Sequence, residues 1–170
     1  GKTSWLISEI EKAQLVDKRI LVVSYIHDNR YSNEFLATHN GNIFKNAEIR
    51  KMEFISDDDC KEFAEKYDFV AVDEGQFFKN LSNSVNTLSR LGCDVIVSCL
   101  SGDFKQTLFD EVRDLIPIAD KIIHLRAICM KCKKGKASFT HKIVSGDEQL
   151  SIGGKDKYVS LCRECLINSK

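Results

Sequence analysis

The sequence predicts an α/β protein with a parallel central sheet. Short apolar runs alternate with segments of helical periodicity, as in chains whose parallel strands are joined by helices. Apolar residues make up 43% of the chain and charged residues 29%, which is typical of globular proteins and excludes disordered and low-complexity classes. The length of 170 residues predicts one domain with at most a small appendage.

The individual elements follow from local patterns. Leu6, Ile7 and Ile10 share one helical face and predict a helix from Thr3 to about Leu15. The acidic run after Ser56 suits the positive end of a helix dipole and begins a second helix, which runs to about Tyr67. Further helices are predicted at Leu81–Leu91 and Leu108–Leu115, buried strands at Arg19–Tyr25, Asp68–Val72 and Asp94–Leu100, shorter strands at Ile49–Phe54 and Lys121–Leu125, and a long loop at 26–47.

Charge divides the chain into two parts. Residues 1–125 carry 15 basic and 21 acidic side chains, whereas residues 126–170 carry 10 basic and 4 acidic ones. We therefore expect an α/β domain over 1–125 and a separate basic domain over 126–170. A basic module is also compatible with a nucleic-acid surface.

The seven cysteines indicate a reducing compartment. An odd number cannot pair completely, and four of the seven form two C-x-x-C pairs. The sequence has no apolar run long enough for a membrane span and no secretory leader, so a cytoplasmic protein without a membrane partner is expected.

The first three residues match the end of a phosphate-binding loop. Gly1-Lys2-Thr3 followed by a helix corresponds to the second half of G-x-x-x-x-G-K-[ST], whose first half would lie upstream. Backbone N–H groups at the helix start hold an anion, the lysine reaches the outer phosphates, and the hydroxyl ligates Mg²⁺. Taken alone, the tripeptide is a weak signal.

Two acids strengthen that hypothesis. The apolar strand before Asp73 and Glu74 ends where an open α/β sheet binds its ligands. Asp73 is the candidate for the Mg²⁺ side, and Glu74 is then free to act as a base on a hydroxyl or a water. The pattern predicts a P-loop (RecA-like) nucleotide-binding domain that catalyses phosphoryl transfer; the alternative is two solvated acids at a strand end.

The two C-x-x-C pairs predict a structural zinc site. Cys129, Cys132, Cys162 and Cys165 offer four thiolates for tetrahedral Zn²⁺ and leave no open position for catalysis. The glycine-containing insert between the pairs, about residues 134–160, would form a lid anchored at both ends. Alternatives are four free or redox thiols, and a surface loop or a basic hairpin that touches nucleic acid.

Several motifs occur in the order found in one enzyme family. They are Gly1-Lys2-Thr3, Asp28-Asn29-Arg30-Tyr31-Ser32, Val72-Asp73-Glu74-Gly75-Gln76-Phe77-Phe78, the two C-x-x-C pairs and Ile152-Gly153-Gly154-Lys155-Asp156-Lys157-Tyr158. Together they resemble the type II thymidine kinases, the cytosolic zinc-containing enzymes, from Gly1 to about Cys165.

The resemblance implies ATP-dependent phosphorylation of the thymidine 5′-hydroxyl, with Mg²⁺ accompanying ATP. By this likeness Gly1, Lys2, Thr3 and Asp73 bind the nucleotide and its metal, while Glu74 is the general base and Arg30 neutralises the transferring phosphoryl group. The implied thymidine-binding residues are Asp28, Phe77, Leu100, Phe104, Phe109, Thr140, Ser151, Ile152, Gly153 and Tyr158. Family membership would further imply a homotetramer and feedback inhibition by thymidine triphosphate.

Two other hypotheses remain open at the level of sequence. One is a kinase of the same fold that also accepts deoxyuridine. The other is a nucleic-acid-binding P-loop ATPase with a zinc ribbon, suggested by the basic C-terminal segment. That segment contains only Phe139 and Tyr158 as aromatic residues, which is few for a base-stacking surface, so no nucleic-acid partner is expected.

Overall fold

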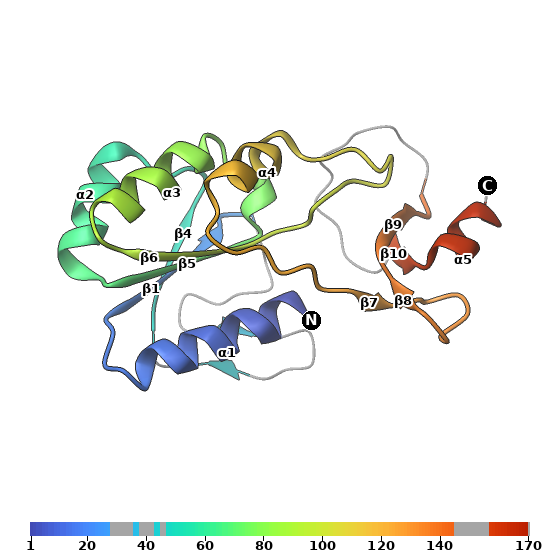
Figure 1. The fold of residues 1–170 in the computed structure, drawn as a ribbon, viewed down its shortest axis with the longest axis horizontal. Coiled ribbons are helices and arrows are strands. Elements are labelled where there is room, and N and C mark those ends of the chain that lie inside the picture. Colours follow the sequence, from blue (N-terminus) through green and yellow to red (C-terminus); the bar gives the residue numbers. More distant parts are fainter. Residues whose placement is uncertain (28–35, 38–42, 45–46, 145–156, 170) are drawn as a thin grey trace.

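A four-stranded parallel sheet forms the centre of the molecule (Figure 1). The structure, a computed structural model, describes residues 1–27, 36–37, 43–44, 47–144 and 157–169. The strand order is β4-β1-β5-β6, and every neighbouring pair is parallel, which confirms the predicted fold class. The strands are β1 (Ile20–Tyr25), β4 (Glu48–Met52), β5 (Phe69–Asp73) and β6 (Asp94–Ser98).

Helix α1 (Lys2–Gln14) covers one face of this sheet. Its buried side chains Leu6, Ile10 and Ala13 pack on side chains that alternate along the central strands. Those partners are Ile20, Val22, Phe69 and Ala71. Because side chains alternate between faces along a strand, the residues at positions 24, 73 and 98 point to this same α1 face.

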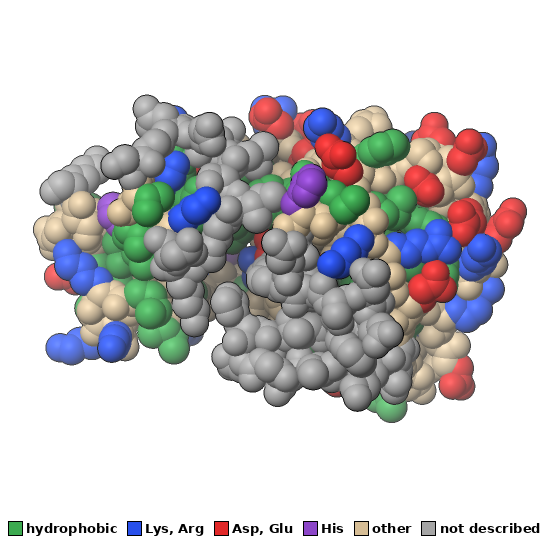
Figure 2. Space-filling view, turned by 180° about the vertical axis from the view of Figure 1, so that it is seen from behind, with side chains coloured by type: hydrophobic (Ala, Val, Ile, Leu, Met, Phe, Trp, Pro, Cys, Tyr) green, Lys and Arg blue, Asp and Glu red, His purple; other side chains and the backbone are tan. Residues whose placement is uncertain are grey.

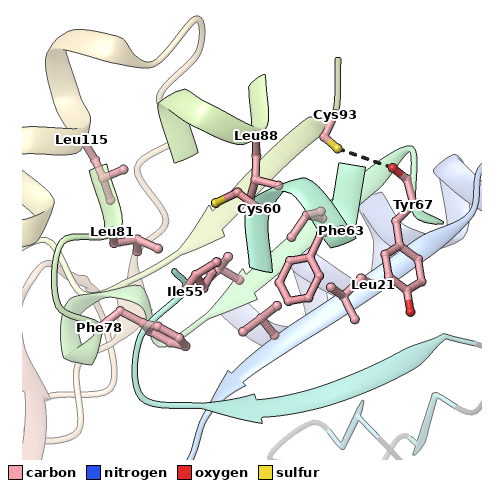
Figure 3. Close-up of a cluster of buried hydrophobic side chains, with 13 residues drawn as sticks. Leu21, Ile55, Cys60, Phe63, Tyr67, Phe78, Leu81, Leu88, Cys93 and Leu115 are labelled. Carbon is pink, nitrogen blue, oxygen red and sulfur yellow. Dashed lines mark hydrogen bonds between the residues drawn. The ribbon is translucent and has the colours of Figure 1, made fainter. Parts of the chain in front are cut away.

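The opposite face carries α2 (Asp57–Lys66) and α3 (Leu81–Arg90) and holds the larger core (Figure 3). Leu21 lies beneath Phe63 of α2, and Leu81 and Leu88 come from α3. Two buried thiols belong to this core: Cys60 donates to the Ser84 carbonyl and Cys93 to the Tyr67 carbonyl. Burial raises the pKa of the Cys60 thiol to about 11, so the thiol stays protonated at neutral pH.

Two short helical segments follow the ends of β5 and β6. The 3-10 helix η1 (Gly75–Phe77) follows β5, and α4 (Asp110–Leu115) leads into a second 3-10 turn, η2 (Ile116–Ile118). Glu111 of α4 accepts hydrogen bonds from the backbone N–H groups of Asn80 and Leu81, at 2.8 Å each. Helix α4 thereby caps the start of α3.

The C-terminal residues form a small group of strands and one helix beside the sheet, called here the C-terminal unit (Figure 1). It contains β7 (Ala127–Ile128), β8 (Lys136–Ala137), β9 (Phe139–Lys142), β10 (Tyr158–Leu161) and α5 (Arg163–Ile167). Its only fully buried apolar residues among those described are Cys129, Ala137 and Leu161. Basic side chains predominate over this end, and both signs are mixed over the α2–α3 end (Figure 2). The division at residue 125 remains a prediction.

One predicted strand is wrong. Residues 121–125 pair with no strand in the part of the chain that the structure describes, and Ile122 is 63% exposed. A branched apolar run favours an extended backbone, but a strand also needs a partner with free backbone groups. This segment instead runs from η2 towards β7.

The loops differ from expectation in two places. Within the predicted loop at 26–47 the chain forms a short antiparallel pair, β2 (Leu36–Ala37) with β3 (Ile43–Phe44). Strands β8, β9 and β10 occupy the ends of the predicted lid, whose centre at 145–156 lies outside the described residues. None of the described helices has the length and apolar character needed to cross a membrane.

Candidate active site

The candidate site lies at the carboxyl ends of β1 and β5. The chain leaves β1 towards β4 on one side and leaves β5 towards β6 on the other. In open α/β sheets such a divergence produces a crevice where ligands bind. The first turn of α1 reaches this edge, because the Lys2 ammonium lies 3.8 Å from a carboxylate oxygen of Glu74. The sequence-predicted partners Lys2, Asp73 and Glu74 therefore meet at one place.

Glu74 owes its orientation to an unusual backbone conformation. In a continuing strand Asp73 and Glu74 would point to opposite faces of the sheet. Glu74 instead adopts a left-handed conformation, with φ 54° and ψ 42°, and so ends β5. A non-glycine residue in this region costs about 1 kcal/mol or more, and such residues cluster at functional sites. The turn directs the Glu74 carboxylate towards Lys2. The residue as a whole is buried, with 5% of its surface exposed.

Asp73 sits in a row of polar residues across three strands. The register places Ser24 of β1 and Ser98 of β6 directly beside Asp73. All three are buried, and among the described residues neither serine hydroxyl has a hydrogen-bond partner. Buried polar atoms normally have partners in protein or ordered water, so these hydroxyls are available to a ligand or its hydration shell. The sequence prediction missed both serines, although a polar residue ending an apolar strand was visible.

Gln76 is a third residue to which the sequence prediction gave no role. It lies in η1 and is 3% exposed. Its side-chain amide nitrogen donates to Glu74 Oε2 at 2.6 Å, and its carbonyl oxygen accepts from the Leu100 backbone N–H at 2.9 Å. The side chain thus joins the end of β5 to the segment after β6.

Cys99 completes the surroundings of the two acids. Burial, followed by the negative charges of Glu74 and Asp73, raises the pKa of its thiol, and the Lys2 ammonium acts in the opposite direction. A thiol in this state is protonated at neutral pH and is a poor nucleophile. The chemistry of the site therefore rests on the carboxylates and the lysine.

Four of the expected substrate-binding residues, Phe77, Phe104, Thr140 and Tyr158, fall into two groups. Phe77 packs against Tyr25 of β1, with ring centroids 5.4 Å apart, next to the acids. Phe104 meets Tyr158 of β10 at 6.4 Å, and the Lys142 ammonium lies 4.8 Å from the Phe104 centroid. Thr140 lies on the same face of the β9–β10 pair as Tyr158, because the register aligns it with Ser160. The loop after β6 therefore contacts the C-terminal unit.

The other predicted site residues are placed as follows. Asp28, Arg30, Ser151, Ile152 and Gly153 lie outside the described residues. Phe109 is buried at the start of α4, with 7% of its surface exposed. Leu100 is placed through its backbone bond to Gln76. Gly1 precedes α1, its carbonyl accepting from the Trp5 N–H at 3.0 Å, and Thr3 lies in the first turn.

The four paired cysteines converge on one point. Their sulfur atoms all lie within 4.8 Å of one another, and Cys132 and Cys162 are 3.9 Å apart. Two sulfurs bound at about 2.3 Å to one tetrahedral zinc would be about 3.8 Å apart, so the geometry fits a four-thiolate metal site. A disulfide would need about 2.05 Å. Local turns aim the thiols: the Lys133 N–H donates to the Cys129 carbonyl, and the Leu166 N–H to that of Cys162.

Comparison with known proteins places this arrangement in a family. The thymidine kinase family model matches residues 1–166. A thymidine kinase of Acanthamoeba polyphaga mimivirus is 37% identical, with 98% of this chain and 76% of the relative covered. Thymidine kinase 1 of Dictyostelium discoideum is also 37% identical, with 97% and 72% covered. The thymidine kinase of vaccinia virus (strain Western Reserve) is 34% identical, with 99% and 92% covered.

The chain belongs to the thymidine kinase family. The resemblance predicted from the ordered motifs is thereby confirmed. The matched region extends from the α1 start to the last cysteine pair, so it includes both the acidic crevice and the four-cysteine cluster. In this member of the thymidine kinase family, Ser24 and Ser98 lie beside Asp73, and Gln76 contacts Glu74, in addition to the residues to which the motifs had given roles.

Proposed function

We propose that the protein is an ATP-dependent thymidine kinase, which transfers the γ-phosphoryl group of ATP to the 5′-hydroxyl of thymidine and yields thymidine monophosphate. The observation that carries the proposal is the Glu74 carboxylate, held 3.8 Å from Lys2 at the carboxyl edge of the sheet. A carboxylate beside a phosphate-binding lysine is suited to deprotonating a hydroxyl that attacks phosphorus. Family membership supplies the nucleoside as the substrate class.

The phosphate donor would bind over the start of α1. The N–H groups of the first helical turn and the Lys2 ammonium would attract the phosphates. The Thr3 hydroxyl and Asp73 would bind the accompanying Mg²⁺, directly or through water. Mg²⁺ bound with ATP offsets the charge that develops on the phosphate oxygens. The donor set of a carboxylate and hydroxyls in the Ser24–Asp73–Ser98 row suits a hydrated Mg²⁺, which prefers oxygen ligands and keeps several waters.

Glu74 would accept the proton of the 5′-hydroxyl as its oxygen attacks the γ-phosphorus. The O–H bond breaks, a new O–P bond forms, and the bond from phosphorus to the β,γ-bridging oxygen breaks with ADP as the leaving group. Arg30, by its place in the shared motif, would neutralise charge on the transferring group. Deprotonation by a positioned base contributes about 10²–10⁴-fold to the rate.

The thymine base would bind between the loop after β6 and the C-terminal unit. Phe104 and Tyr158 approach each other across these two parts and offer aromatic faces. Phe77, Leu100, Phe109 and Thr140 would complete the pocket, with Asp28 binding the sugar and 151–153 binding the base through backbone groups. This assignment rests on the family motifs and on the Phe104–Tyr158 contact.

We further propose that the four-cysteine cluster binds structural Zn²⁺ and anchors a lid. Support comes from the four sulfur ligands and from the metal type that thiolates in tetrahedral geometry select. A cytoplasmic location agrees with reduced cysteines. A homotetramer with feedback inhibition by thymidine triphosphate follows from the resemblance, and exposed apolar residues at 116–128 offer surface for self-assembly.

The test is a transfer assay with the full-length protein. Mg·ATP is supplied with thymidine, deoxyuridine, deoxycytidine or deoxyguanosine, and the nucleoside monophosphates are quantified. We expect strong turnover of thymidine and little of deoxycytidine. Glu74→Gln should bind nucleotide normally but lower kcat by about 10²–10⁴-fold; activity within a few-fold of wild type would remove Glu74 as the base.

The nucleic-acid-binding ATPase is not favoured by the family assignment. It would regain support if no nucleoside were phosphorylated and ATP hydrolysis were stimulated by DNA in a salt-dependent way.

A further inference from the structure

Gln76 makes a short hydrogen bond to the carboxylate that the proposed mechanism uses. Its amide nitrogen lies 2.6 Å from Glu74 Oε2, whereas the Lys2 ammonium lies 3.8 Å from Oε1. The first distance is a hydrogen bond to a charged group, and the second is a looser ion pair. Of these two contacts the amide is therefore the one that fixes where the carboxylate lies.

The orientation of the amide follows from the chemistry of its neighbours. An ionised carboxylate only accepts hydrogen bonds, and a backbone N–H only donates them. The Gln76 NH₂ must therefore face Glu74, and its carbonyl must face the Leu100 N–H, as observed. Reversing the amide would oppose two acceptors at one end and two donors at the other. Both ends of a side chain that is 3% exposed are thus satisfied in only one orientation.

The same side chain ties together two elements that need a fixed separation. Glu74 ends β5, and Leu100 lies two residues beyond β6, in the segment that leads to Phe104. Glu74 has a left-handed backbone and three side-chain torsions, so its carboxylate needs an external contact to hold one position. Gln76 provides one such contact, the shorter of the two described above, and links the carboxylate to the loop after β6.

We propose that Gln76 is a positioning residue that holds the Glu74 carboxylate at a fixed distance from the substrate-binding segment around Leu100. The inference rests on the proposed function, because it assigns Gln76 a role through the general base. Gln76 does not itself transfer a proton. Its effect is to hold the base in line with the nucleoside hydroxyl, and an error of about 1 Å in such a geometry costs on the order of 10²-fold in rate.

The first experiment replaces Gln76 by methionine, which has a similar length and no hydrogen-bonding amide. We expect Gln76→Met to lower kcat for thymidine by about 10–100-fold, with the KM for ATP within about two-fold of wild type. The matched control is Gln14→Met at the end of α1, far along the helix from Lys2, which should leave kcat and KM unchanged. Thermal unfolding is measured for each protein. If Gln76→Met does not fold, it is replaced by Gln76→Asn, whose side chain keeps the amide but is too short to reach both Glu74 and Leu100.

The second experiment is a double-mutant cycle with Glu74→Gln. If Gln76 acts through Glu74, adding Gln76→Met to Glu74→Gln should change kcat by less than about two-fold, although it costs 10–100-fold in the wild type. Equal losses in both backgrounds would overturn the proposal and assign Gln76 a purely structural role. So would a Gln76→Met enzyme with wild-type kcat. An inactive wild type would instead refute the proposed function, so the two failures are distinguishable.

Discussion

At the scale of single residues, the site depends on a sharp turn directly after β5. Glu74 is left-handed, and Gly75 then passes close to the neighbouring strand. A Cβ built on Gly75 would lie 2.5 Å from Val97 Cγ1 and 3.1 Å from Leu81 Cδ2. Val97 is β-branched and has little freedom to move aside, so only glycine lets η1 start at this position.

We therefore expect Gly75→Ala to destabilise the protein and to impair catalysis. The extra methyl group must displace Val97 or the turn, and overpacking of this kind costs about 1–3 kcal/mol. Urea unfolding gives the free energy, and kcat for thymidine reports the displacement of Glu74 and Gln76. Gly92→Ala is the comparison. A Cβ at position 92 would have no atom within 4 Å, but the backbone φ of 95° is strained for alanine, so this variant should be less stable without a change in kcat per folded molecule. Unchanged stability of Gly75→Ala would contradict the close contact.

At the scale of secondary-structure elements, sequence patterns predicted the strands and helices that form the sheet domain. Arg19–Tyr25, Asp68–Val72 and Asp94–Leu100 each correspond to a strand within two residues. The predicted strand at Lys121–Leu125 does not form, because a short apolar sequence does not determine whether a neighbouring strand is available for backbone pairing. The Asp73–Glu74 pair was predictable from its place after an apolar strand. The position of Ser24 and Ser98 directly beside Asp73 could not be predicted, because it depends on the register between the strands.

Contacts between elements can be tested at Glu111. Its carboxylate accepts from the first N–H groups of α3, where Asn80 is the N-cap and supplies no side-chain cap of its own. We expect Glu111→Ala to lower the free energy of unfolding by about 0.5–2 kcal/mol, because those N–H groups lose their acceptor. Chemical denaturation measures the loss. Asp110→Ala, which removes the neighbouring exposed acid paired with Arg113, is the control and should cost less than about 0.5 kcal/mol. Equal effects of the two substitutions would argue against the cap.

At the scale of the whole molecule, the two parts differ in what stabilises them. The sheet domain has two extensive apolar cores, one on each face. The described part of the C-terminal unit buries only Cys129, Ala137 and Leu161 fully. Burying one leucine contributes about 1.5–3 kcal/mol, whereas ordering each residue's backbone costs about 1–2 kcal/mol. So small a core does not by itself offset the entropy of ordering this unit, and we therefore expect a metal bound at the four-cysteine cluster to contribute to its stability.

This imbalance leads to a prediction about metal removal. Cys162→Ser removes one of the four clustered sulfurs, the proposed zinc ligands, at the start of α5, so we expect less than one equivalent of zinc per chain by elemental analysis. Hydrogen exchange should then speed up in residues 127–142 and 157–169, while the amides of β1 and β5 keep wild-type protection, because structural zinc contributes directly to folding. Cys93→Ser is the matched control, because Cys93 lies outside the cluster and the new hydroxyl can still donate to the Tyr67 carbonyl. The zinc content of this variant should stay at one equivalent per chain. A wild-type protein without zinc, or a Cys162→Ser protein that retains zinc and protection in the C-terminal unit, would refute the assignment. If Cys162→Ser loses thymidine turnover while β1 and β5 keep their protection, the defect lies in the C-terminal unit. The loss would then come from the proposed base-binding region around Tyr158 and not from the acidic site around Glu74.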